Sequence, residues 1–135
     1  MKQVKTIIMV NIKTIERANP QEPSAPKKFY AHAIADGQVD LERLAYLVSN
    51  QCTVRESDCY AVLLALQHNI MDELRQGRIV KLDKIGSFQV GVRSTGMTLA
   101  EEVGSHTVKS AHLNFRPAKR LRNMLTNVEF KLISG

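Results

Sequence analysis

Residues 77–92 carry a clear alternation of apolar and polar positions. Their sequence is GRIVKLDKIGSFQVGV, with apolar side chains at alternating positions on both sides of Gly86. A period of two is typical of strands that bury one face. The segment therefore predicts two strands joined by a tight corner at Gly86-Ser87. Gly77, at its start, predicts the end of a preceding helix.

Two amphipathic helices are predicted before this hairpin. Asp40 can cap the first helix, which ends near Asn50, because apolar residues recur there at spacings of three and four. Thr53 and Glu56 match a capping box at the start of a longer helix, 53–76. The apolar stripe of this helix is wider than one small domain needs, so part of it is expected to pack against a second copy of the chain.

A polar, glycine-punctuated segment follows the hairpin. Residues 93–111 therefore predict an arm or long loop. A strand is expected at 108–115 and a short helix at 118–126, with Pro117 in its first turn. Residues 128–133 predict a final strand.

The N-terminal region differs from the rest of the chain. Residues 3–16 are rich in β-branched side chains and predict one strand. The run 19–26 holds three of the four prolines, which excludes a helix or central strand. This run predicts a stiff connector that joins the N-terminal strand, as an appendage, to the main domain.

Length and charge limit the possible functions. A chain of 135 residues is long enough for one domain with its own core. The net charge is +6, with +4 in residues 1–30, −4 in residues 31–76 and +6 in residues 77–135. Positive charge concentrated at both ends favours an anionic partner, which can be nucleic acid, an acidic protein or a membrane surface.

Catalytic and metal-binding chemistry has little support in the sequence. Cys52 and Cys59 match neither a zinc spacing nor a redox pair, and are expected to be reduced thiols. His68 is assigned no ligand-type partner four residues on, and is interpreted as a surface or interface histidine. No nucleotide-binding or nucleophile motif occurs, so neither an enzyme, a cofactor, a metal nor a small-molecule substrate is expected. No segment has the length of a membrane span or signal peptide, which predicts a soluble cytoplasmic protein.

Four features in order resemble the HU family of bacterial histone-like DNA-binding proteins, which includes integration host factor. They are the helix pair 40–76 ending at Gly77, the corner Ile85-Gly86-Ser87-Phe88, the strand end Phe115-Arg116-Pro117 and the basic helix Lys119-Arg120-Leu121-Arg122. The resemblance implies an α+β fold and an intertwined homodimer. The terminal strands look like those of extended Bacteroidetes-type relatives, and are expected to pair with each other or to edge the sheet.

This resemblance implies a domain plan and two sets of residues. The plan is an N-terminal strand and linker at 1–26, an HU-like DNA-binding domain at 27–127 and a strand extension at 128–135. The expected dimer core comprises Leu63, Leu66, Ile70, Phe88 and Phe115. The expected DNA-binding residues of the nucleoid protein are basic, and comprise Lys81, Lys84, Arg93, Lys109, Arg116, Lys119, Arg120 and Arg122.

The arm departs from the family pattern. Arms of this family insert an apolar wedge, usually proline, into the minor groove, but residues 93–111 contain no proline and include Glu101 and Glu102. Met97 and Leu99 are candidate substitutes for the wedge. The sequence therefore predicts sequence-nonspecific binding of double-stranded DNA through the body and arm bases, with weak or absent kinking. The alternative is an HU scaffold that has lost DNA binding and serves as a structural or protein-interaction module.

Overall fold

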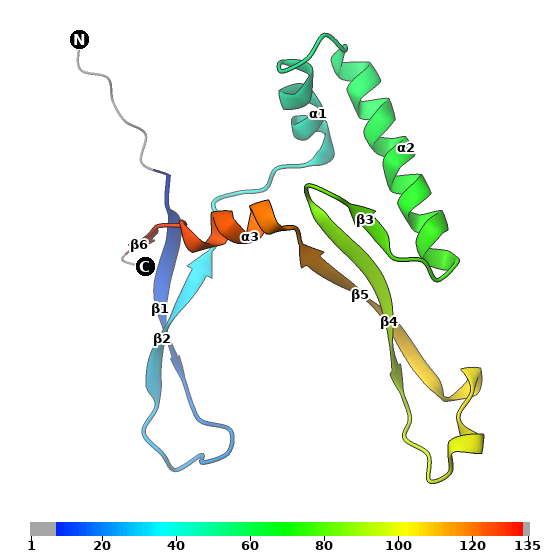
Figure 1. Ribbon diagram of the computed structural model, residues 1–135. Helices are drawn as coiled ribbons and strands as arrows, with labels where there is room; N and C mark the ends of the chain where they lie inside the picture. The colour runs from blue at the N-terminus through cyan, green and yellow to red at the C-terminus, as the bar shows by residue number, and fades with distance from the viewer. Residues whose placement is uncertain (1–7, 134–135) are drawn as a thin grey trace. The chain divides into compact units, whose positions relative to one another are not determined.

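The computed structural model describes residues 8–133, which form two compact units. One unit, called the body, is Asp40–Met124, and the other, the terminal sheet unit, takes the chain before and after it. Each unit contains one three-stranded sheet (Figure 1), which confirms the expected α+β class. In chain order the elements are β1 (Val10–Arg17), β2 (Lys28–Ile34), α1 (Leu41–Ser49), α2 (Glu56–Arg75), β3 (Val80–Leu82), β4 (Gly86–Ser94), the 3₁₀ turns η1 (Ala100–Glu102) and η2 (Ser105–Thr107), β5 (Val108–Pro117), α3 (Lys119–Thr126) and β6 (Phe130–Leu132).

The body begins with the helix pair α1 and α2. As predicted, Asp40 caps α1, since its carboxylate accepts a hydrogen bond from the Arg43 backbone N–H at 2.8 Å. The helices pack together, and each contributes one buried apolar residue, Ala45 and Cys59. Burial, with a smaller effect of the Cys52 thiol, raises the pKa of Cys59. Both cysteines are free thiols.

The start of α2 differs from the prediction. The capping box of Thr53 and Glu56 is wrong, because Arg55 holds the N-cap position and no side chain caps the helix. The first turn carries Glu56 and Asp58 instead, and carboxylates there interact favourably with the helix dipole.

The end of α2 agrees with the prediction. Gly77 has a φ of +79°, a left-handed conformation that favours glycine. Its N–H donates to Leu74 O at 3.0 Å, and the Arg78 N–H donates to Glu73 O at 3.2 Å. These two bonds complete a Schellman motif and turn the chain toward β3.

The body sheet has the strand order β3-β4-β5 and is antiparallel throughout. The predicted corner at Gly86-Ser87 is wrong. The Ile85 N–H donates to Leu82 O at 2.8 Å, so the turn precedes Gly86, which already lies within β4.

Gly86 is required by the close approach of β5. A Cβ at this position would meet the Arg116 carbonyl oxygen and lie 2.5 Å from the Phe115 ring. Pro117 pairs with Gly86 and ends β5, so the prediction that it opens the helix is wrong. The glycine and proline motifs therefore mark one strand contact.

The region 93–111 is only partly a loop. β4 continues to Ser94 and β5 begins at Val108, so both strands take residues from the predicted arm. The remaining residues, 95–107, include the two 3₁₀ turns at the far end of the ribbon (Figure 1).

The terminal sheet has the strand order β2-β1-β6. β1 pairs with β6 in parallel, which confirms the expected pairing of the terminal strands; residues 3–7 of the predicted strand lie outside the described residues. β1 pairs with β2 antiparallel, from Asn11↔Ile34 to Arg17↔Lys28. The proline-rich run closes this hairpin, so its prediction as a connector between domains is wrong.

We predict that Gly86→Ala destabilises the body by about 1–3 kcal/mol, because the new methyl group has no space beside β5. Gly96→Ala is the matched control, since a Cβ there meets nothing within 4 Å, and it should change stability by less than about 0.5 kcal/mol. Urea denaturation of both variants at equal protein concentration measures the difference. Equal midpoints for the two variants would contradict the close-approach argument.

Candidate nucleic-acid interface

The strand register separates the body sheet into an apolar and a polar face. On β4 and β5, Phe88 pairs with Phe115 and Val90 with Leu113, and these rows lie on the apolar face. The Phe88 and Phe115 rings are 5.0 Å apart. The intervening rows are polar, because neighbouring residues along a strand point to opposite sides.

The polar face, as we use the term, consists of four registered rows. The first row crosses all three strands as Lys81, Ser87 and Arg116. The next rows are Gln89 with Asn114, Gly91 with His112, and Arg93 with Ser110. Ser87, Gln89, Asn114 and Arg116 also line a shallow hollow of about 180 Å³ together with Ile79.

Gly91 leaves space that two polar side chains use. A Cβ on Gly91 would lie 2.5 Å from His112 Nε2 and 2.9 Å from Asn114 Nδ2. The two side chains therefore lie over the bare glycine backbone. The polar face thus contains hydrogen-bonding groups at its centre and cations at both ends.

A second group of cations lies where α3 begins. The Ala118 N–H donates to Ile85 O at 2.9 Å, which fixes the first turn of α3 against the β3–β4 turn. Lys84, Lys119 and Arg120 line a pocket of about 270 Å³ there, with Asp83, Ala118 and Asn123. We call Lys84, Lys119 and Arg120 the turn cluster.

The structure places the eight predicted basic residues in different environments. Lys81, Arg93 and Arg116 lie on the polar face, and three more form the turn cluster. Lys109 follows the alternation of Ala111, and so lies on the apolar side of β5. Arg122 is exposed on α3 but does not line the pocket.

Sequence reasoning missed the polar residues between these cations. Gln89, His112 and Asn114 share a face with Arg116, but they were not assigned to the site. The alternation along each strand was the available signal. It was not used across strands, because the pairing of residue 89 with residue 114 becomes visible only with the register.

A hydrogen-bonded clamp around Thr107 holds the tip of the β4–β5 ribbon. Thr107 is 2% exposed, and its hydroxyl donates to Gly104 O at 2.8 Å. Its Oγ1 lies 3.2 Å from Ser94 Oγ, and its carbonyl accepts from the Thr95 N–H at 2.9 Å. Glu101 and Glu102 form the exposed turn η1 in the same loop.

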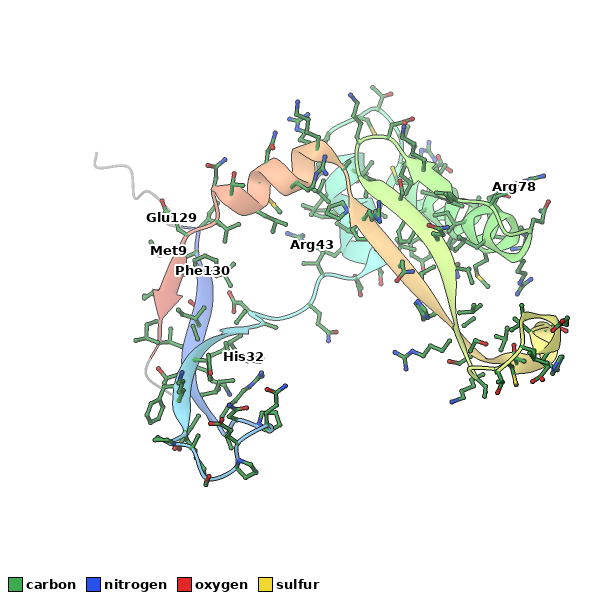
Figure 2. The ribbon with its side chains drawn as sticks, turned by 60° about the horizontal axis from the view of Figure 1, so that its bottom comes forward. Met9, His32, Arg43, Arg78, Glu129 and Phe130 are labelled. Atoms are coloured by element: carbon green, nitrogen blue, oxygen red, sulfur yellow. The ribbon has the colours of Figure 1, made fainter. Side chains whose placement is uncertain are left out.

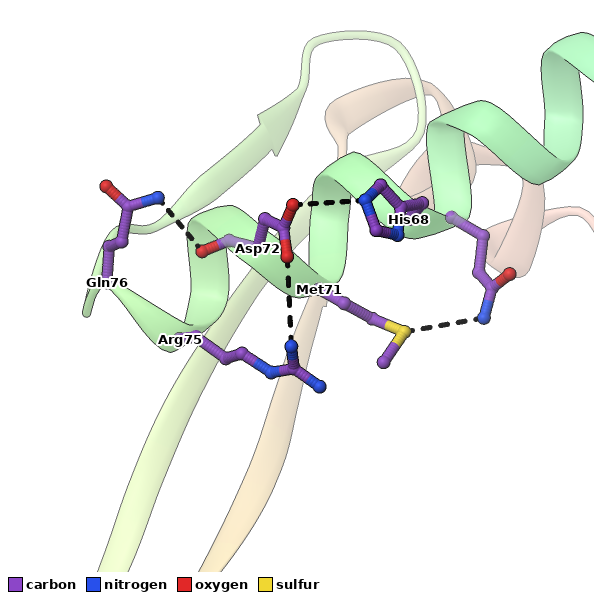
Figure 3. Close-up of polar contacts among 6 residues, drawn as sticks. His68, Met71, Asp72, Arg75 and Gln76 are labelled. Atoms are coloured by element: carbon purple, nitrogen blue, oxygen red, sulfur yellow. Dashed lines mark hydrogen bonds and ion pairs between the residues drawn. The ribbon is translucent and has the colours of Figure 1, made fainter.

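The carboxylates of α2 make local ion pairs. His68 Nε2 lies 3.2 Å from Asp72 Oδ2, and Arg75 lies 3.8 Å from the same carboxylate (Figure 3). The sequence interpretation overlooked Asp72 as a partner four residues after His68. Both side chains are largely exposed, which agrees with a surface histidine. Within residues 8–133, no three His, Cys, Asp or Glu side chains are grouped closely enough to hold a metal.

Large apolar side chains remain open on the body. On the sheet, Val90, Val92, Leu113 and Phe115 are all exposed. Among the expected dimer-core residues, Leu66 and Phe115 are exposed, whereas Leu63, Ile70 and Phe88 are half-buried. In the part of the chain that the structure describes, no helix has the length and apolar character needed to cross a membrane.

The fold defines the class of protein. A helix pair, a three-stranded sheet with a long two-stranded ribbon, and a helix after Pro117 match the HU fold. The structure of Anabaena HU in a cocrystal with DNA covers 64% of this chain and 97% of that chain, with 20% sequence identity and a TM-score of 0.51. The crystal structure of a candidate bacterial DNA-binding protein from Bacteroides vulgatus ATCC 8482 covers 92% of this chain, with 14% identity and a TM-score of 0.62. The chain spans about half (48%) of the length of that second protein.

The family match is more extensive than either structural match. Residues 9–131 match the model of the HU-HIG family, described as an HU domain fused to a wHTH, Ig or glycine-rich motif. The chain therefore belongs to this family, which confirms the resemblance to HU. Neither the family nor the fold defines an enzyme class. No curated protein is significantly similar to the sequence.

We predict that Thr107→Val loosens the ribbon tip, because valine keeps the volume but removes the hydroxyl that donates to Gly104 O. The cost should be about 1–2 kcal/mol, seen as faster amide hydrogen exchange confined to residues 95–107. Thr98→Val, at an exposed position of the same loop, should leave exchange unchanged. Equal exchange in both variants would contradict the clamp.

Proposed function

We propose that this chain is a non-enzymatic architectural protein that binds double-stranded DNA with little sequence preference, as a homodimer in the bacterial nucleoid. The observation that carries the proposal is the registered polar face, which has cations at both ends and hydrogen-bonding side chains between them. The turn cluster continues this positive surface onto α3. The names of the similar structures, which refer to DNA, agree with it.

The composition of the polar face suits a phosphate backbone. Arginine and lysine neutralise phosphates and release counterions, which supplies affinity without reading sequence. Ser87, Gln89 and Asn114 can donate hydrogen bonds to phosphate and sugar oxygens. The four rows contain no carboxylate, although Asp83 lies 3.6 Å from Lys81 at the edge.

The homodimer follows from the apolar face on the other side of the same ribbon. Val90 and Leu113 are exposed in the single chain, as is Leu66 on α2. Leaving such side chains in water forgoes about 1.5–3 kcal/mol each. A second copy offers the same apolar surface, and a two-fold dimer interface uses the same patch on both subunits.

The ribbon tip argues against sharp DNA kinking. Residues 95–107 lack proline and form a short loop held by Thr107. Glu101 and Glu102 are exposed there and would repel phosphate. Met97 and Leu99 are the apolar side chains left for insertion, so we expect binding along the ribbon without a strong bend.

The same acidic tip is the observation that favours a second function. A scaffold that has lost DNA binding would keep the fold and use its exposed surfaces for protein contacts. Charge on the ribbon separates the two functions, since only a DNA-binding protein needs its cations on one registered face.

We predict that log K for a random-sequence duplex falls with log salt concentration, by about 0.9 for each phosphate contacted. Replacing Lys119, Arg120 and Arg122 by Gln should reduce this slope by up to about 2.7, as measured by fluorescence anisotropy. The control replaces Arg43, Arg55 and Arg75, which lie on or beside α1 and α2, and should reduce the slope less. If the wild-type chain does not bind duplex at low salt, the DNA-binding proposal fails and the scaffold function takes its place.

We predict that Leu113→Asp disrupts the dimer, since a carboxylate buried without a partner costs several kcal/mol. Leu99→Asp is the matched control, because the two leucines are 56% and 55% exposed in the single chain. Sedimentation should show monomer or unfolded chain for the first variant and dimer for the second. A dimeric Leu113→Asp protein as stable as the control would place the interface elsewhere.

A further inference from the structure

The terminal sheet is also divided into two chemically different faces. Its first face pairs Ile12 of β1 with Ala33 of β2 and Leu132 of β6. Val10 pairs with Phe130 in the adjacent row, and Phe29 follows from β2. Figure 2 marks Phe130 on β6. This face is almost wholly apolar, with Glu16 as its one charged strand residue.

The second face of the terminal sheet, called the terminal basic face, is cationic. Its rows are Lys131 with Asn11 and Ile34, Lys13 with His32, Ile15 with Tyr30, and Arg17 with Lys28. Four cations therefore come from three strands. These rows contain no carboxylate. His32, marked on β2 in Figure 2, lies between cationic rows and is exposed.

A hollow continues the terminal basic face into the hairpin loop. Its volume is about 550 Å³, and Arg17, Lys28 and Tyr30 line its strand side. Loop residues enclose the other side, and comprise Ala18, Asn19, Pro20, Glu22, Ala25 and Pro26. The Asn19 side chain accepts a hydrogen bond from the Gln21 N–H at 3.0 Å, and Ala25 N–H donates to Glu22 O at 3.0 Å, so the loop has a defined shape.

We propose that the terminal basic face is a second nucleic-acid-binding surface, separate from the polar face of the body. Lys13, Arg17, Lys28 and Lys131 contact backbone phosphates, and Tyr30 supplies an aromatic surface beside the hollow. Cations that follow a track, with an aromatic ring on which a base can stack, are the chemistry that recognises nucleic-acid strands. Tyr30 is 49% exposed, so its ring is accessible to a base.

Charge complementarity favours nucleic acid as the occupant of this face. An apolar face must be covered, so the basic face is the one that remains in solvent when the apolar face packs. Lysine and arginine on adjacent strands repel one another across rows, and like charges directly opposite, such as Arg17 and Lys28, destabilise a pair of strands. A polyanion removes that repulsion along the whole track. The inference is independent of the body site, although both use phosphate as the ligand.

The test compares four full-length proteins: wild type, the terminal variant K13Q/R17Q/K28Q/K131Q, the body variant K119Q/R120Q/R122Q, and the control R43Q/R55Q/R75Q/R78Q. The control removes as many charges as the terminal variant from exposed positions on or beside α1 and α2. Salt series are measured with a random-sequence duplex and with an oligo(dT) strand of equal length. Circular dichroism melting checks that every variant is folded.

We expect the terminal variant to lower the salt slope by up to about 3.6 on duplex, or by up to about 2.8 on a single strand, and the control to lower it by less than one contact. The probe that loses more slope identifies the form of nucleic acid bound. Tyr30→Ala should weaken oligo(dT) binding by about fivefold or more if a base stacks on the ring. Tyr46→Ala, in a ring exposed on α1, is its control.

The outcomes separate this inference from the proposed function. If the body variant loses slope and the terminal variant matches the control on both probes, the second surface does not exist while the proposed function stands. If only the terminal variant loses slope, the body site fails and the second surface stands. Polyglutamate is the competing probe: loss of polyglutamate binding by the terminal variant, with its nucleic-acid slopes unchanged, would assign this face to an acidic protein and overturn the inference.

Discussion

The pairing register of β4 with β5 is the constraint on which the body depends. Because Phe88 lies opposite Phe115, every odd-numbered neighbour on β4 is paired with an even-numbered polar residue on β5. A shift by one residue would put Gln89 among the phenylalanines and expose Phe88 with the cations. Gly86 fixes this register at one end, because only a residue without Cβ fits against Arg116 and Phe115 there. The bulge at Arg93 and Ser94 ends the regular pairing at the other.

One register therefore produces both the DNA-facing surface and the need for a partner. The polar side gathers cations from three strands, and the apolar side leaves Val90 and Leu113 without sufficient cover. A single chain buries few apolar residues, with Ala45 and Cys59 the buried ones among residues 8–133. In a dimer, covering the apolar sides would orient two polar faces at once. Association and ligand binding would then be coupled, since anything that disorders the interface also disorders the polar face.

Much of this architecture could be predicted from the sequence, and the failures have a common cause. Local signals located the helix pair, the Asp40 cap, the end of α2 at Gly77 and the ribbon strands, because caps and periodicity act within a few residues. The proline-rich run was misinterpreted, since a linker and a hairpin loop have the same composition. The pairing of Arg17 with Lys28 decides between them, and it depends on neighbours distant in sequence. Lys109 was assigned to the site for the same reason, because its charge is visible in the sequence but its strand face is not.

The two sheets then use one physical design twice. In each, strand alternation places apolar residues on one face and cations on the other, without carboxylates among the cationic rows. A uniform positive charge for solubility would not require this separation, because cations dispersed among acids are equally soluble. The acidic groups lie elsewhere: Asp72 is paired on α2, and Glu101 and Glu102 are at the ribbon tip. Carboxylates at the tip would oppose entry of the ribbon end between DNA strands, while the cations behind it hold the backbone. That distribution favours a protein that lies along DNA over one that wedges it open.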